Sequence, residues 1–153
     1  TGLTAAAQRA EALGVRLAIE PLNRFETDLV NTTQQGLALC ADIGSPAAGL
    51  LLDTFHMNIE EKSIGDAIRA AGDRLVHVHA CENDRGTVGG AHIPWPEVFT
   101  ALGDIGYDGQ VVIESFTPSV TTIARAVCMW RPLDATGDAL ATAGLAFLRQ
   151  SAA

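Results

Sequence analysis

Four short apolar segments, each ending in a carboxylate or an imidazole, constrain the fold of this chain more than any other feature. The segments RLAIE, LLLD, LVHVH and VVIE end on Glu20, Asp53, His79 and Glu114. The run of leucines before Asp53 is too short and too apolar for a surface element, which indicates a strand that is buried on both faces. An acid at the end of a buried strand is costly unless a partner or a metal ion pairs with it.

Helical segments alternate with these four strands. Apolar periodicity and capping residues predict helices over residues 3–13, 32–43, 63–71, 96–105, 121–129 and 137–150, and strands over 15–19, 49–52, 74–79 and 110–113. Strands that alternate with helices indicate right-handed βαβ crossovers and a parallel sheet. The segment after Asp53, which holds His56, is expected to be a loop.

The spacing of the strand ends indicates a particular α/β fold. Successive strand-end residues are 33, 26 and 35 positions apart, the pitch of βα units in a (β/α)8 TIM barrel, where catalytic residues lie at the carboxyl ends of strands. A complete barrel takes about 250 residues. We therefore expect residues 1–153 to form a single domain that is the C-terminal half of a barrel, strands 5–8, with the four N-terminal βα units absent.

A half-barrel exposes two sheet edges and an apolar inner face. We accordingly expect either a fragment of a longer protein or a half-barrel that self-associates as a homo-oligomer.

Composition and charge exclude several classes of partner. The net charge is −8, so the chain has no overall basic surface for nucleic acid or anionic lipid. No apolar run approaches the roughly 18–20 residues that span a bilayer, and no signal peptide opens the sequence. Three cysteines at irregular spacings are typical of free thiols, and they predict a cytoplasmic location.

The strand-end residues form a mixed oxygen and nitrogen donor set. Two glutamates, one aspartate and one histidine suit a hard divalent ion such as Mn²⁺, Mg²⁺ or Co²⁺ better than an ion that prefers thiolates. Three converging carboxylates without a cation would repel one another. The alternative interpretation is that polar residues merely end these strands, and the spacing alone leaves both open.

Several blocks that keep their mutual spacing resemble one family. EPLNRFET, LLDTFHMNIEE, HVHACENDRG, GGAHIPWPEVFTAL and IGYDGQVVIESF are similar to the D-tagatose 3-epimerase/D-psicose 3-epimerase family of the xylose-isomerase-like superfamily. The similarity runs from about Gly14 to Arg149. It implies a metal ion, most often Mn²⁺, and a substrate site. The implied metal ligands are Glu20, Asp53, His79 and Glu114, and the implied substrate-binding residues are Glu26, His56 and Arg85.

The resemblance also implies an activity. Ketose 3-epimerases invert C3 of a free sugar through an enediolate, and here Glu20 and Glu114 would remove and return the proton. Rival interpretations on the same scaffold are a hydroxypyruvate isomerase and an inosose isomerase or dehydratase. An endonuclease-IV-like DNA enzyme is disfavoured by the negative charge. A non-catalytic half-barrel fragment is the alternative from another class.

Five further residues are expected to have structural rather than chemical roles. His77 is predicted to be a hydrogen-bonded core histidine below His79, because the two share one strand face. Glu60 and Glu61 are predicted to lie in a solvated turn. Trp95 and Phe99 are predicted to pack between barrel and helix.

Overall fold

A parallel sheet of four strands forms the centre of the protein, which the computed structural model describes over residues 2–152. The strands lie in chain order and every neighbouring pair is parallel. They are β1 (Leu17–Ile19), β2 (Ala48–Asp53), β3 (Leu75–Ala80) and β4 (Val111–Ile113). The predicted alternation of strands and helices is therefore confirmed.

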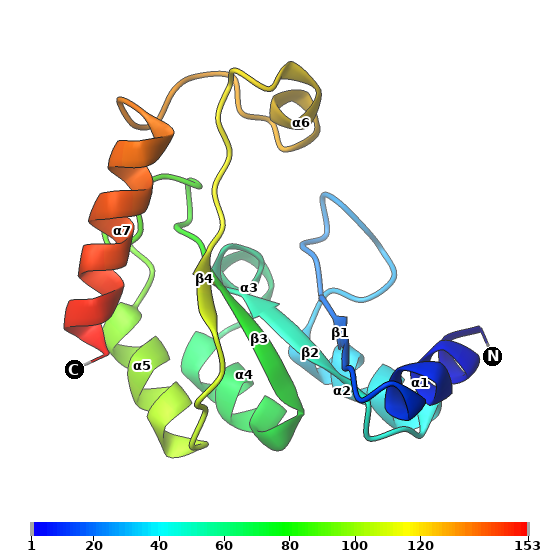
Figure 1. The fold of residues 1–153 in the computed structure, drawn as a ribbon. Helices are drawn as coiled ribbons and strands as arrows, with labels where there is room; N and C mark the ends of the chain where they lie inside the picture. Colours follow the sequence, from blue (N-terminus) through cyan, green and yellow to red (C-terminus); the bar gives the residue numbers. More distant parts are fainter. Residues whose placement is uncertain (1, 153) are drawn as a thin grey trace.

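The longer helices form an arc along one side of the sheet, with the two termini at opposite ends of the arc (Figure 1). The longer helices are α1 (Gly2–Ala12), α2 (Thr33–Ile43), α4 (Ile64–Ala71), α5 (Trp95–Asp104) and α7 (Gly137–Ser151). Shorter ones are α3 (Thr54–Glu60), α6 (Thr121–Ala126) and the 3-10 turn η1 (Gly72–Arg74).

Local sequence signals explain where α2 begins and ends. The Thr32 hydroxyl accepts a hydrogen bond from the Gln35 main-chain N–H, and the Gln35 side chain accepts one from the Thr32 main-chain N–H, which makes a capping box. Gly44 ends the helix in the left-handed conformation at φ 70°.

The alternation of side chains along each strand separates a packed face from an open one. Leu50, Leu52 and Val78 are at most 2% exposed and belong to the core that the helices cover. The intervening residues lie on the other face, where Leu51 is half-buried and Val112 is 40% exposed. The chemistry-bearing ends of the strands belong to this second, inner face.

The prediction of a loop after Asp53 is wrong, because residues 54–60 form α3. Asp53 is itself the N-cap, and its Oδ1 accepts a hydrogen bond from the Phe55 main-chain N–H at 2.7 Å. The segment contains no glycine or proline, and burial of His56 and Met57 stabilises the helical turn. His56 therefore lies on a helix rather than on a loop.

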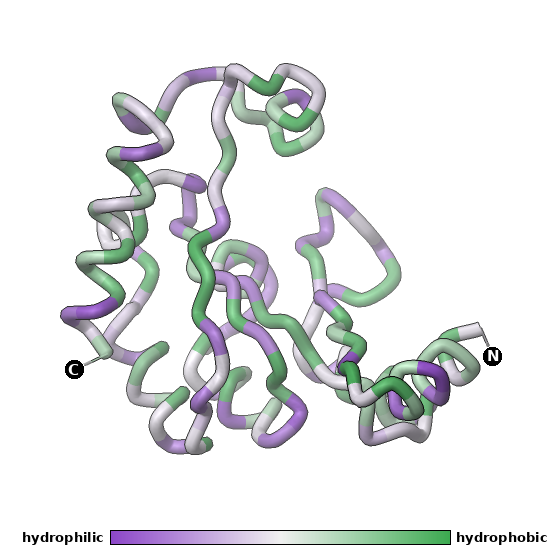
Figure 2. The backbone as a smooth tube through the Cα atoms, viewed as in Figure 1, coloured by the Kyte–Doolittle hydropathy of each residue, from purple (hydrophilic) through white to green (hydrophobic). Residues whose placement is uncertain are grey.

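Hydropathy along the backbone follows this arrangement. Strand β2 is mostly hydrophobic along its length (Figure 2), and its sequence AGLLLD ends on the carboxylate Asp53. Over residues 2–152, no helix combines the length and the apolar character needed to cross a lipid bilayer.

Candidate metal centre and substrate site

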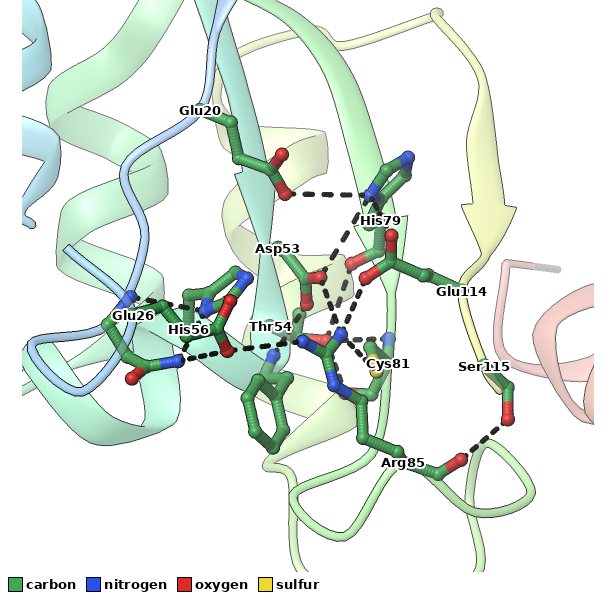
Figure 3. Close-up of polar contacts among 12 residues, drawn as sticks. Glu20, Glu26, Asp53, Thr54, His56, His79, Cys81, Arg85, Glu114 and Ser115 are labelled. Atoms are coloured by element: carbon green, nitrogen blue, oxygen red, sulfur yellow. Dashed lines mark hydrogen bonds and ion pairs between the residues drawn. The ribbon is translucent and has the colours of Figure 1, made fainter. Parts of the chain in front are cut away.

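The four strand-end side chains converge at the carboxyl edge of the sheet (Figure 3). Asp53 and His79 are neighbours in the parallel register of β2 and β3. From His79 Nδ1, the distances are 3.7 Å to Glu20 Oε1, 3.9 Å to Asp53 Oδ2 and 3.4 Å to Glu114 Oε1. All four strands thus contribute one group to a single cluster.

The donor atoms of this cluster are suited to a cation. Asp53, His79 and Glu114 offer ligand atoms that lie within 4.8 Å of one another. His79 Nδ1 is buried and has no hydrogen-bond partner within the described residues, which is unusual for a buried polar atom. Three carboxylates around a free imidazole nitrogen match the donor preference of a hard divalent ion.

Burial and neighbouring charges shift the ionisation of these groups. Burial, followed by the adjacent Glu114 carboxyl, raises the pKa of Asp53 well above its ordinary value. Contact with Glu20 raises the pKa of His79, although partial burial opposes that shift. Burial lowers the pKa of His56, which favours its neutral form. The shifts therefore run in opposite directions within one cluster, upward for the pKa values of Asp53 and His79 and downward for that of His56.

Arg85 enters the same cluster from the loop after β3. Its Nη1 lies 2.5 Å from Glu114 Oε2 and 3.4 Å from Asp53 Oδ2, and the guanidinium stacks 3.8 Å from the Phe55 ring centroid. Only 5% of the side chain is exposed. The main chain at Arg85 is in the left-handed region at φ 67°, and Ser115 Oγ donates a hydrogen bond to its carbonyl oxygen at 2.6 Å.

The remaining predicted substrate residues lie beside the cluster. A ring nitrogen of His56 and the carboxylate oxygens of Glu20 and Asp53 also lie within 4.8 Å of one another. They form a second possible ligand group, which shares Asp53 with the first. Glu26 Oε1 is 3.8 Å from Arg85 Nη2. The structure therefore brings all seven predicted site residues to one edge of the sheet, and their individual roles stay predictions.

Two buried polar residues near the site were missed by sequence reasoning. Asn23 is 2% exposed and contacts both His56 and Glu26. Glu82 is fully buried and accepts hydrogen bonds from Trp95 Nε1 at 2.7 Å and from the Gly89 main-chain N–H at 2.9 Å. Both belong to the blocks that carry the resemblance, but nothing in a local pattern indicates that they are buried.

Two structural predictions need correction. Glu60 is not a solvated turn residue, because it is the last residue of α3 and its side chain, 5% exposed, forms an ion pair with Arg24 at 2.9 Å. Glu61 lies in the turn before α4, as predicted, where its half-buried carboxylate accepts a hydrogen bond from the Thr33 main-chain N–H at 2.7 Å. His77 is half-buried rather than a core residue, since it lies on the open inner face with its ring edge-on to His79.

The packing role of the aromatic pair is confirmed. Trp95 is 4% exposed, and its ring centroid lies 6.3 Å from that of Phe99 and 5.9 Å from that of Phe147.

Comparison with known proteins identifies the architecture. The sequence profile of the family described as "Xylose isomerase-like TIM barrel" matches residues 1–151. The structure titled "Structure of L-ribulose 3-epimerase" superposes with a TM-score of 0.94 at 41% identity, over 98% of this chain and 51% of that one. The predicted half-barrel of parallel βα units is confirmed by this superposition.

Curated relatives carry similar names. The "D-psicose 3-epimerase" of Agrobacterium fabrum is 44% identical over 137 residues, which cover 90% of this chain and 47% of that protein. The "D-psicose 3-epimerase" of Ruminiclostridium cellulolyticum is 46% identical over 132 residues, covering 86% of this chain and 45% of that protein. The chain spans about half the length of the curated relatives it matches.

Proposed function

Because the chain belongs to the xylose isomerase-like TIM barrel family, we propose that it carries the metal-binding half of a ketose 3-epimerase that interconverts C3 epimers of a free ketose. The observation that carries this proposal is the cluster of three carboxylates around the unpartnered Nδ1 of His79. The 3-epimerase names of the relatives support the choice of reaction.

The cluster fits a divalent cation, with Mn²⁺ as the first choice and Mg²⁺ or Co²⁺ as alternatives. Hard carboxylate oxygens with a single imidazole favour these ions over thiolate-seeking ones. When bound, the cation would supply Lewis acidity that polarises the ketose carbonyl. The residues proposed to hold it are Glu20, Asp53, His79 and Glu114.

Two of these carboxylates are the proposed proton-transfer groups. Glu20 follows β1 and Glu114 follows β4, the two outer strands of the sheet, so they flank the cluster from opposite sides. Inversion at C3 requires a base on one face of the carbon and an acid on the other. One glutamate would remove the C3 proton to give an enediolate, and the other would return a proton to the opposite face.

The substrate would be oriented by groups beside the cluster. The Arg85 guanidinium and the His56 imidazole are donors held in place by buried contacts, which suits oxygens that gain negative charge. Glu26 would accept a hydrogen bond from a sugar hydroxyl. A hydroxypyruvate or inosose isomerase would use the same proton transfer next to a carbonyl, and it differs only in substrate.

The test is Glu114→Gln, measured as conversion of D-fructose to its C3 epimer in D₂O with Mn²⁺. Because the chain spans half of its relatives, the assay is run on the chain alone and with the N-terminal half of the Agrobacterium fabrum relative supplied as a second chain. Wild type should give a product that carries solvent deuterium at C3. Loss of the general acid–base group should slow the reaction by about 10²–10⁴-fold.

The matched control is Glu11→Gln, an exposed carboxylate on α1 that should keep wild-type activity. Unchanged epimerisation by Glu114→Gln, or product without deuterium at C3, would refute the assignment. Plasma-emission analysis of bound metal separates the enzyme from a non-catalytic half-barrel, which should hold no stoichiometric ion.

A further inference from the structure

The buried amide of Asn23 has an orientation that its hydrogen bonds determine. The Phe25 main-chain N–H donates to Asn23 Oδ1 at 2.9 Å, so this atom is the acceptor end of the amide. The opposite end, Nδ2, donates to Glu26 Oε1 at 2.8 Å and lies 2.9 Å from His56 Nδ1. With 2% of the residue exposed, water cannot take over these contacts.

The contacts with Asn23 also determine which nitrogen of His56 carries the proton. The main-chain N–H of Asn23 donates to His56 Nδ1 at 3.2 Å, in addition to the side-chain amide on the same atom. A nitrogen that faces two N–H donors must present its lone pair. His56 is therefore a neutral imidazole whose proton is on Nε2, which makes Nε2 a donor.

This tautomer distinguishes the two imidazoles of the site. Two groups that share Asp53 could hold a metal ion: one adds Glu20 and His56, and the other adds His79 and Glu114. A metal ligand must offer a lone pair, which Nε2 of His56 lacks when it bears the proton. His79 Nδ1, by contrast, has no hydrogen-bond partner within residues 2–152 and faces three carboxylates.

We propose that Asn23 is a positioning residue that keeps His56 as an N–H donor toward a substrate oxygen and thereby directs the cation to the group containing His79. The ring of His56 lies beside the carboxyl groups of Glu20 and Asp53 (Figure 3), close enough to compete for the ion if its tautomer were reversed. The role toward a substrate oxygen rests on the proposed function, whereas the tautomer and the choice of metal ligand do not.

The tautomer is tested by long-range ¹H–¹⁵N NMR of the cation-free full chain labelled with ¹⁵N-histidine, with His56→Gln used to assign the ring. Wild type should show the His56 proton on Nε2. Asn23→Asp replaces the Nδ2 donor with an acceptor of the same shape and leaves only the main-chain N–H facing Nδ1, so it should raise the fraction of rings that carry a proton on Nδ1. A wild-type ring protonated on Nδ1 overturns the proposal.

The choice of ligand is tested by calorimetric titration with Mn²⁺. His79→Gln should weaken binding at least about tenfold, whereas His56→Gln should bind like wild type. Equal losses in both variants, or no Mn²⁺ binding by wild type, would contradict the assignment. Failure to epimerise ketoses would refute the proposed function and leave the NMR and Mn²⁺ results standing.

Discussion

At the scale of single residues, the arrangement depends on how three clustered carboxylates are balanced. Arg85 contacts Asp53 and Glu114 directly and lies within 3.8 Å of Glu26, so its guanidinium neutralises charge that would otherwise be repulsive. Its planar fork and its stacking on Phe55 make it better suited to this place than a lysine. A bound cation would also neutralise these carboxylates.

Arg85→Met should therefore destabilise the metal-free protein strongly. Removing one partner of a buried ion pair costs about 3–5 kcal/mol, because the remaining charges lose their counterion. Mn²⁺ should restore part of this loss by neutralising the same carboxylates. The measurement is urea unfolding with chelator and with Mn²⁺.

The matched control for this substitution is Arg69→Met, which removes a cation paired with Asp104 at the surface. It should change the free energy of unfolding by no more than about 1 kcal/mol, with or without metal. Equal losses in both variants would show that Arg85 is not the counterion of the cluster.

At the scale of elements, a buried carboxylate shapes the loop between β3 and α5. Glu82 accepts hydrogen bonds from the start of α5, through Trp95 Nε1, and from Gly89 in the middle of the loop. Its main-chain oxygen also accepts from the Arg85 N–H at 3.0 Å, within the turn that directs Arg85 to the site. The loop is thus held at both ends and at its middle by one residue.

Trp95 and Gly89 donate to Glu82 Oε1, and the Ile93 main-chain N–H donates to Oε2 at 3.4 Å. Glu82→Gln should destabilise the protein by about 1.5–3 kcal/mol, because an amide offers one acceptor oxygen where the carboxylate offers two, and charged acceptors bind more strongly. Urea unfolding followed by tryptophan fluorescence measures the change. Asp84→Asn is the control, since this exposed carboxylate in the same loop accepts a hydrogen bond from the Gly86 main-chain N–H, and its effect should stay within about 0.5 kcal/mol. If Glu82→Gln left the free energy of unfolding unchanged, the role of Glu82 in holding this loop would be contradicted.

An ion pair between Arg24 and Glu60 connects the loop after β1 to α3, and its contribution to stability depends on pH. The side chain of Arg24, then its main-chain N–H, donates to Glu60 and lowers the pKa of that carboxyl below its ordinary 4.5. A carboxyl whose pKa is lower in the folded state stabilises the protein above its unfolded pKa, and this contribution disappears as the pH falls through the lowered value.

Glu60→Gln should accordingly lower the melting temperature at neutral pH. At about pH 2 the variant should match wild type, because the side chain at position 60 is then uncharged in both proteins. Thermal unfolding followed by circular dichroism across this range checks it. Lys62→Gln, an exposed change two residues away, should leave the pH profile unaltered. A Glu60→Gln deficit that is constant with pH would argue against the ion pair as its source.

At the scale of the whole molecule, the open face of the sheet is the dominant feature. The helices cover one side, while the inner side presents half-buried and exposed apolar residues, among them Leu51 and Val112. The outer strands β1 and β4 each have one unpaired edge within the described sheet. Exposed edges and apolar faces of this kind promote association with other chains.

We expect the 153-residue chain alone to elute above its monomer mass of 16.0 kDa in size-exclusion chromatography with light scattering. Val112→Glu, on the inner face of β4, should shift the population toward monomer because it places charge on the associating surface. Leu145→Glu, an exposed apolar position on α7 with 44% exposure, should not. A monodisperse wild-type monomer would refute the expectation.

Much of this molecule is determined by the chain itself. Hydrophobic periodicity, caps such as Thr32 and Gly44, and the spacing of four strand-end residues predict the βα order and the parallel sheet, because these signals are local. The convergence of the strand ends follows from that topology, since parallel strands place their carboxyl ends at one edge.

Tertiary structure decided the rest. Several features depend on partners far away in the sequence. They are the helix over residues 54–60, the burial of Glu82 and Asn23, and the position of Arg85 between carboxylates. A polar side chain has the same local signature whether water or a buried neighbour satisfies it, so only the folded chain shows which partner it has. The same holds for the proton on His56, which contacts across 33 residues place on Nε2.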